Sequence, residues 1–129
     1  MTAFRTKFPR RAGVSRIWYA GLYSFRGLSA AWRGQAAFRQ EALLALVMVP
    51  AAFWLGRGAI EQILLVGSVV LVLIVELCNS AIETAVDRIG SELHPLSGAA
   101  KDMGSAAVLL CLLQALFVWV LLGIQRFGS

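Results

Sequence analysis

The sequence predicts an all-α membrane protein: a single integral membrane domain, residues 1–129, with one amphipathic surface helix and three transmembrane helices. First, 59% of the residues are hydrophobic and only 15% are charged, whereas soluble domains carry about 25% charged residues. Second, three apolar stretches can each be extended to the roughly 20 residues that a helix needs to cross a bilayer. Third, eight of the 12 Lys and Arg residues precede residue 41, which favours contact with anionic lipid head groups.

The amino-terminal third is basic and amphipathic. Residues 1–13 combine basic side chains with Pro9 and Gly13, and we predict a flexible tail. Over 14–33, apolar side chains recur at helical spacing and alternate with arginines and tyrosines. This pattern predicts a helix in the membrane interface, with its aromatic rings at head-group depth. A basic segment also suits nucleic acid, but no nucleic-acid-binding motif is present, so we predict no such partner.

The first two transmembrane helices are predicted over 36–56 and 60–89. The apolar part of 36–56 is short, and it contains Pro50, which should kink the helix. A short turn at 56–58 separates the two helices. A helix over 60–89 is about 45 Å long, so its second half must leave the hydrocarbon.

The last third of the chain has a polar connection and one more apolar stretch. Residues 90–103 are predicted to connect the helices, with Pro95 and Gly98 as breakers. The third transmembrane helix is predicted over 104–124, and its small first residues permit close helix contact. Three crossings place the termini on opposite sides, and the basic amino terminus should be cytoplasmic. The polar connection then faces the cytoplasm too.

Ionisable side chains line one face of the second predicted transmembrane helix. Glu76, Asn79, Glu83 and Asp87 lie at i, i+3, i+7 and i+11, within roughly 80° of one another around a helix. Charged residues at membrane depth are costly and usually functional. We call these four residues the acidic face.

The acidic face suits phosphoryl transfer to a lipid alcohol. Carboxylates can bind Mg²⁺, which brings nucleotide phosphates with it, and a carboxylate can accept a proton from a hydroxyl group. Lys101 and Arg16 can neutralise phosphate charge. These are the parts that phosphoryl transfer requires. The sequence has no GxxxxGK[ST] phosphate-binding loop, so a nucleotide site would be built differently.

Other interpretations stay open at this point. Glu76 and Asn79 can simply bond neighbouring helices, and the charges of Asp87 and Lys101 can be solvated. His94 can be structural. The acidic face could also conduct protons or ions, but this would require polar partners along the whole membrane depth, and the apolar stretches offer only Ser68, Ser105 and Gln114.

The chain resembles the prokaryotic diacylglycerol kinases over about residues 14–124. Glu76 to Asp87 match the pattern E-x-x-N-[ST]-A-I-E-x-x-V-D, Lys101 to Val108 read K-D-M-G-S-A-A-V, and Ala36 to Glu41 read A-A-F-R-Q-E. The resemblance implies a homotrimer in the bacterial cytoplasmic (inner) membrane, with its active site on the cytoplasmic side. It also implies transfer of the γ-phosphate of Mg²⁺-bound ATP to diacylglycerol, giving phosphatidic acid.

The resemblance assigns roles to individual residues. Glu76 matches the catalytic base, Asn79 an essential polar neighbour, and Glu83 a carboxylate that binds metal and serves the nucleotide. We expect the nucleotide to be contacted by Glu83 and by Arg16, Tyr23, Gln35, Asp87, Glu92, His94, Lys101 and Asp102. We expect the lipid substrate to be contacted by Glu76 and by Arg39, Gln40, Glu41, Trp54 and Ser105.

Gln35 departs from the family pattern, which usually has a second metal-binding Glu at this position. An amide oxygen is a poorer Mg²⁺ ligand than a carboxylate. Gln35 could still coordinate weakly, the site could recruit another carboxylate such as Glu41, or this form could be much weakened. Two alternatives to diacylglycerol kinase activity therefore stay open: the same chemistry on undecaprenol, and a non-catalytic trimeric membrane scaffold.

Overall fold

The computed structural model describes residues 12–90 and 92–128, and this part of the chain forms four α-helices without any strand. Three of the helices are long and apolar enough to cross a membrane, which confirms this part of the predicted fold. Most of the predicted tail, residues 1–11, lies outside the described residues. The helices are α1 (Val14–Gly34), α2 (Ala36–Leu55), α3 (Ala59–Ile89) and α4 (Pro95–Phe127).

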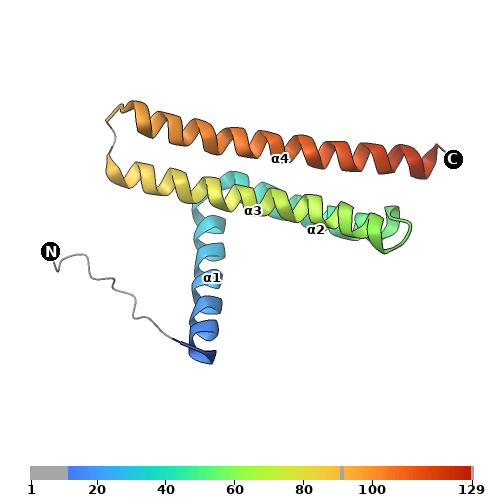
Figure 1. Ribbon diagram of the computed structural model, residues 1–129, viewed down its shortest axis with the longest axis horizontal. Coiled ribbons are helices and arrows are strands. Elements are labelled where there is room, and N and C mark those ends of the chain that lie inside the picture. Colours follow the sequence, from blue (N-terminus) through green and yellow to red (C-terminus); the bar gives the residue numbers. More distant parts are fainter. Residues whose placement is uncertain (1–11, 91, 129) are drawn as a thin grey trace.

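The helices α2, α3 and α4 run side by side, and α1 lies crosswise to them (Figure 1). The chain changes direction at Gln35, whose extended backbone (φ −125°, ψ 105°) interrupts the helix between α1 and α2. Arg39 stabilises this corner, because its Nη1 donates hydrogen bonds to the carbonyl oxygens of Trp32 at 2.8 Å and Arg33 at 3.1 Å. These carbonyls belong to the last turn of α1, where no following turn of the helix supplies a backbone N–H to bond them.

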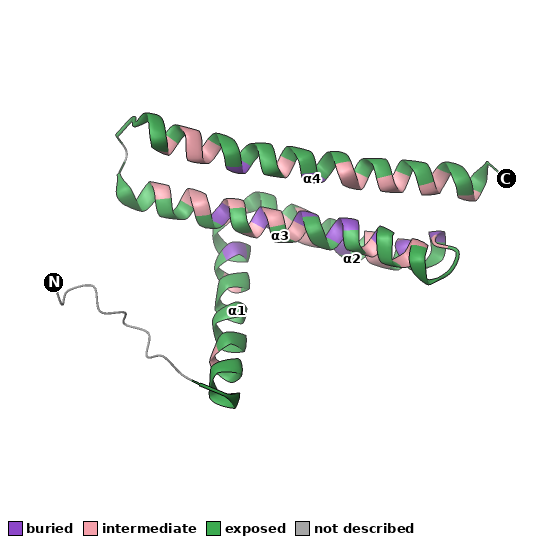
Figure 2. Cartoon of the chain, viewed as in Figure 1, coloured by how far each residue is buried: buried purple, intermediate pink, exposed green. Residues whose placement is uncertain are grey.

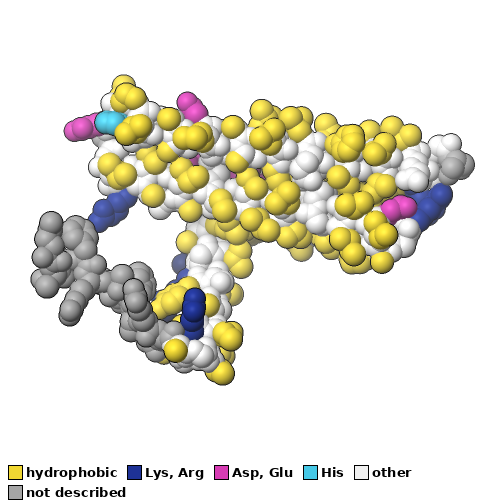
Figure 3. Space-filling model, in the orientation of Figure 1, with side chains coloured by type: hydrophobic (Ala, Val, Ile, Leu, Met, Phe, Trp, Pro, Cys, Tyr) yellow, Lys and Arg dark blue, Asp and Glu magenta, His cyan; other side chains and the backbone are white. Residues whose placement is uncertain are grey.

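Helix α3 is the centre of the bundle and packs against both α2 and α4. Its buried residues recur along the helix from Leu65 to Ser80 (Figure 2), and Leu65 forms a hydrophobic cluster with Ala52 and Leu55 of α2. In contrast, α4 buries only Gly104 and Cys111 among its described residues. Hydrophobic side chains cover the visible face of the three-helix part (Figure 3). Such faces suit a hydrocarbon surrounding, in which helices satisfy their own backbone hydrogen bonds.

The turn predicted at 56–58 is confirmed, but the polar connection predicted over 90–103 is wrong in its second half. Helix α4 begins at Pro95 and continues through Gly98. Proline is well tolerated in the first turn of a helix, because its missing N–H would have no helical acceptor there. His94 caps this helix, since its Nδ1 accepts a hydrogen bond from the Leu96 N–H at 3.1 Å. The start of α4 thus projects nine residues beyond the predicted span.

Polar residues in the apolar halves of α3 and α4 bond to one another. Trp119 Nε1 donates to Ser68 Oγ at 3.0 Å, Ser68 Oγ donates to the Leu65 carbonyl at 2.7 Å, and Gln114 Nε2 donates to the Ser68 carbonyl at 3.0 Å. Hydrogen bonds of this kind hold membrane helices together. Ser68 and Gln114 therefore have a structural role, which gives no support to a conduction path.

The bond between Trp119 and Ser68 predicts a measurable loss of stability when the indole is replaced. We expect Trp119→Phe to destabilise the folded protein by about 1 kcal/mol, the scale of interhelical hydrogen bonds in membranes. Unfolding in mixed detergent micelles, followed by circular dichroism, measures the change. Trp18→Phe is the matched control, because Trp18 is 67% exposed on α1. Equal free energies of unfolding for Trp119→Phe and Trp18→Phe would contradict this role for the hydrogen bond.

Candidate functional site

Glu76 lies in the middle of the structure rather than at its surface. Its side chain projects from α3 and is only 6% exposed. Glu41 of α2 and Glu83, two turns along α3, lie within electrostatic range of it. A carboxylate in this position is costly unless it has a task or a partner. The described residues nevertheless contain no group of three or more His, Cys, Asp or Glu side chains that could hold one metal ion.

Asn79 and Glu83 form a pair one turn beyond Glu76. Asn79 Nδ2 donates a hydrogen bond to Glu83 Oε1 at 3.3 Å. The other polar atom of the amide, Oδ1, is buried without a hydrogen-bond partner, and it lies against Gly104 of α4. The Asn79 amide is therefore held between a carboxylate of its own helix and the backbone of the next helix.

Asp87 and Lys101 join α3 to α4 at the end of the acidic face. Lys101 Nζ lies 2.8 Å from Asp87 Oδ1, and the side chains are 45% and 67% exposed, respectively. An exposed pair of this kind adds little to stability. Its position allows both side chains to reach a ligand outside the bundle.

Glu92 and His94 border a hollow of about 510 Å³ at the same end of the bundle. Ile89, Gly90, Leu96 and Ser97 complete its wall. Asp102 and Ser105 are exposed on the first turns of α4. Glu92, His94 and Asp102 thus lie near the Asp87–Lys101 end in sequence and structure, although His94 also caps α4.

The α1 residues of the predicted nucleotide site are separate from this group. Arg16 and Tyr23 are exposed on α1, and the Tyr23 ring neighbours Tyr19 and the Arg26 guanidinium, 6.4 Å and 5.8 Å from its centroid. Within the described part of the chain, α1 contacts α2 and α3 but not α4. One chain therefore does not bring Arg16 and Tyr23 to Lys101 and Asp102.

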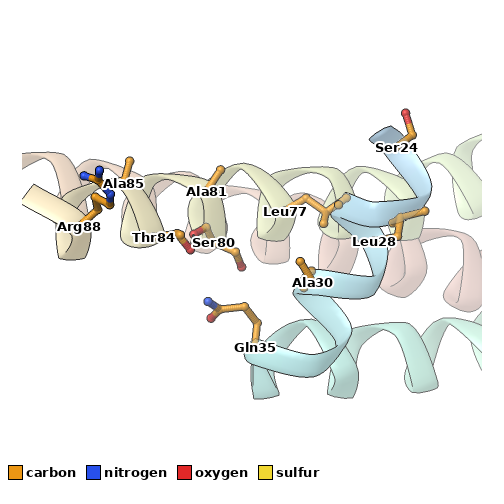
Figure 4. Close-up of a pocket in the computed structure, with 12 residues that line it drawn as sticks. Ser24, Leu28, Ala30, Gln35, Leu77, Ser80, Ala81, Thr84, Ala85 and Arg88 are labelled. Carbon is orange, nitrogen blue, oxygen red and sulfur yellow. Dashed lines mark hydrogen bonds between the residues drawn. The ribbon is translucent and has the colours of Figure 1, made fainter. Parts of the chain in front are cut away.

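Gln35 borders a different space, a hollow of about 810 Å³ between α1 and α3. Figure 4 shows its side chain pointing toward Ser80 and Thr84, with Arg88 farther along α3. Glu83 is not among the residues that line this hollow. The remaining lining residues are Ser24, Gly27, Leu28, Ala30, Ala31, Leu77, Ala81 and Ala85.

Sequence reasoning missed the polar residues that line the same hollow as Gln35. Ser80, Thr84 and Arg88 recur at i, i+4 and i+8, which forms a second polar stripe beside the acidic face. The spacing was visible in the sequence, but hydroxyl groups on a helix commonly bond their own backbone. Thr84 does so, since its Oγ1 donates to the Ser80 carbonyl at 2.7 Å.

The predicted lipid-contacting residues are also divided between two regions. Arg39, Gln40 and Glu41 lie in the first turns of α2, where Arg39 closes the end of α1. Trp54 lies near the other end of α2, about 20 Å away at 1.5 Å per residue. There its ring packs 5.8 Å from Phe127 and 5.8 Å from the Arg126 guanidinium. Trp54 therefore stands apart from Glu76.

The donor set around Glu83 suits Mg²⁺ bound together with a nucleotide. Magnesium in such sites takes one or two carboxylates and completes its coordination with phosphate oxygens and water. Glu83 is partly buried, and Asn79 orients one of its oxygens. Glu83 fits the role of a single protein carboxylate, whereas the contribution of Gln35 stays a prediction.

The chain is similar to known proteins over most of its length. A family model described as prokaryotic diacylglycerol kinase matches residues 22–122. The diacylglycerol kinase of Escherichia coli K12 is 55% identical over 116 residues, covering 90% of this chain and 95% of the relative. Those of Pseudomonas aeruginosa and Haemophilus influenzae are 49% and 46% identical, covering 90% and 85% of this chain and 96% and 93% of the relatives. This chain therefore belongs to the prokaryotic diacylglycerol kinase family.

Proposed function

We propose that this chain is a lipid kinase that transfers the γ-phosphate of ATP to the primary hydroxyl group of diacylglycerol, producing phosphatidic acid and ADP. The observation that carries the proposal is the buried Glu76 carboxylate, one turn from the Asn79–Glu83 pair, in a member of this family. The three relatives described above are all named diacylglycerol kinase, which favours diacylglycerol over undecaprenol as the acceptor.

Glu76 acts as the general base in this proposal. Its carboxylate accepts the proton of the lipid hydroxyl as the oxygen bonds to the γ-phosphorus, and the bond from that phosphorus to the bridging oxygen of ADP breaks. Burial at 6% exposure keeps water from the carboxylate, so the lipid hydroxyl competes with little water for the phosphoryl group. The position within a predicted transmembrane helix suits an acceptor that stays in the bilayer.

Glu83 and the charges near it bind the nucleotide in this proposal. Glu83 would hold Mg²⁺ that arrives with ATP, and the ion would neutralise charge on the phosphates. Asn79 orients the Glu83 carboxylate through its Nδ2 hydrogen bond. Lys101, released from Asp87, can donate to a phosphate, and its exposure permits this exchange.

We further propose a homotrimer in the bacterial cytoplasmic membrane, with the site on the cytoplasmic side. Among the described residues of one chain, α1, which carries Arg16 and Tyr23, does not contact α4, which carries Lys101. Glu83 is not among the residues that line the hollow beside Gln35. A neighbouring copy that packed against the exposed face of α4 could supply the missing groups, because symmetric copies present the same surfaces. The predominance of basic residues before residue 41 supports a cytoplasmic amino terminus.

The lipid specificity provides the direct test. We expect the purified protein in mixed micelles to phosphorylate diacylglycerol when ATP and Mg²⁺ are present, with kcat/KM at least about tenfold higher than for undecaprenol, a difference of about 1.4 kcal/mol. Transfer of radiolabelled γ-phosphate to each lipid measures both rates side by side. Preference for undecaprenol would reassign the acceptor, and transfer to neither lipid would favour the scaffold.

A further inference from the structure

We infer that Gly104 is a positioning residue. Because it has no side chain, it leaves room for the Asn79 amide at the position from which this amide donates a hydrogen bond to Glu83. The inference rests on the proposed function, because Asn79 and Glu83 are the groups that it places at the nucleotide. Gly104 itself has no group that could touch the reacting atoms. Its effect must therefore pass through Asn79.

Helix α4 approaches α3 closely at Gly104. Gly104 is one of two buried residues described in α4. A Cβ atom built on Gly104 would overlap Asn79 Oδ1 and would lie 3.2 Å from Asn79 Cγ, whereas Ile82 Cδ1 would be at an ordinary 3.7 Å. The space that a Cβ would occupy is thus filled almost entirely by the Asn79 amide.

The Asn79 amide cannot move or rotate without a cost in free energy. A carboxylate only accepts hydrogen bonds, so Nδ2 must face Glu83 and Oδ1 must face Gly104. Oδ1 is buried without a hydrogen-bond partner, and it lies against the backbone of Gly104. Displacing the amide would break the Asn79–Glu83 bond and free the carboxylate to adopt other rotamers.

The other glycines within α3 and α4 have room for a side chain. A Cβ built on Gly123, also in α4, or on Gly67 of α3 would meet nothing within 4 Å. Alanine should be accommodated at both positions because there is room for its methyl group. Alanine also has a higher helix propensity than glycine. Gly123→Ala is therefore a control on the same helix for any effect of adding a methyl group to α4.

The experiment measures nucleotide binding, kinetics and unfolding. We expect Gly104→Ala to weaken binding of the Mg²⁺ complex of a non-hydrolysable ATP analogue by roughly 10–100-fold, the effect of losing a group that orients a metal ligand. The KM for ATP should rise while the KM for diacylglycerol stays within about twofold, because only nucleotide-binding groups are displaced. Gly123→Ala should match the wild type in each measurement. A merely structural defect would lower kcat without this division between the two KM values.

A double-mutant cycle identifies Asn79 as the intermediary. Gly104→Ala should lower the unfolding midpoint of the wild type, but not that of Asn79→Ala, in which the overlapping amide is absent. The same decrease in the unfolding midpoint with and without Asn79→Ala would overturn the inference. Equal nucleotide binding and equal unfolding midpoints for Gly104→Ala and Gly123→Ala would overturn it too. If the wild type neither binds nor uses ATP, the proposed function fails, and the unfolding cycle still decides whether Gly104 acts through Asn79.

Discussion

Glu76→Gln is expected to reduce the rate of diacylglycerol phosphorylation by roughly 10²–10⁴-fold, the contribution of a positioned general base. The amide has the shape of the carboxylate but cannot accept the proton of the lipid hydroxyl. Glu76 is only 6% exposed, and replacement of a buried charge by a neutral group of equal size should leave the fold intact. The assay is phosphoryl transfer in mixed micelles, with circular dichroism as the check on folding.

Glu61→Gln is the matched control for this substitution. Glu61 lies in the first turn of the same helix, where its Oε1 accepts a hydrogen bond from the Arg57 N–H at 3.1 Å. An amide oxygen can accept the same bond, so we expect turnover close to that of the wild type. If Glu76→Gln kept the wild-type rate, Glu76 would not be the base, and its burial would need another explanation.

Gln35→Glu is expected to increase activity, by roughly 10–100-fold at limiting Mg²⁺, if position 35 contributes to the metal site in the assembled protein. The added carboxylate supplies the oxygen ligand and the negative charge that Mg²⁺ prefers, and changes at metal sites commonly alter affinity on this scale. The measurement is the Mg²⁺ dependence of kcat/KM. The concentration of Mg²⁺ that gives half of the maximal rate should fall.

The outcome of Gln35→Glu also separates the two leading functions. A large gain supports a kinase weakened at position 35, whereas no activity in either form supports a non-catalytic scaffold. High activity unchanged by the substitution would instead show that position 35 does not serve the metal. Gln125→Glu, near the far end of α4, is the control for an added negative charge.

Much of the fold could be predicted because transmembrane helices can be recognised in a sequence by their length and hydropathy. The helices over 14–34, 36–55 and 59–89 agree with the predicted ranges within one residue at each end. The start of α4 could not be predicted, because Pro95 and Gly98 are breakers in most settings. Here proline occupies the first turn, and His94 satisfies the Leu96 N–H. Only the local geometry distinguishes a helix start from a loop.

The candidate site, too, could be predicted only in part from the sequence. The spacing of Glu76, Asn79 and Glu83 was sufficient to place them on one side of a helix, since helical periodicity relates sequence to direction. The hydrogen bond between Asn79 and Glu83 agrees with that placement. Nothing in the spacing could indicate that Gln35 faces Ser80 and Thr84, because the corner at Gln35 sets the direction of its side chain.

The sequence by itself determined that the chain is helical and apolar, which helix carries the acids, and to which family it belongs. These properties depend on composition, periodicity and short motifs, all of which are local along the chain. The tertiary structure alone decided which helix covers that acidic face, where Gly104 meets Asn79, and that Gln35 borders the same hollow as Ser80 and Thr84. The physical reason is that packing depends on contacts between residues distant in sequence, and no periodicity within one helix specifies its neighbour.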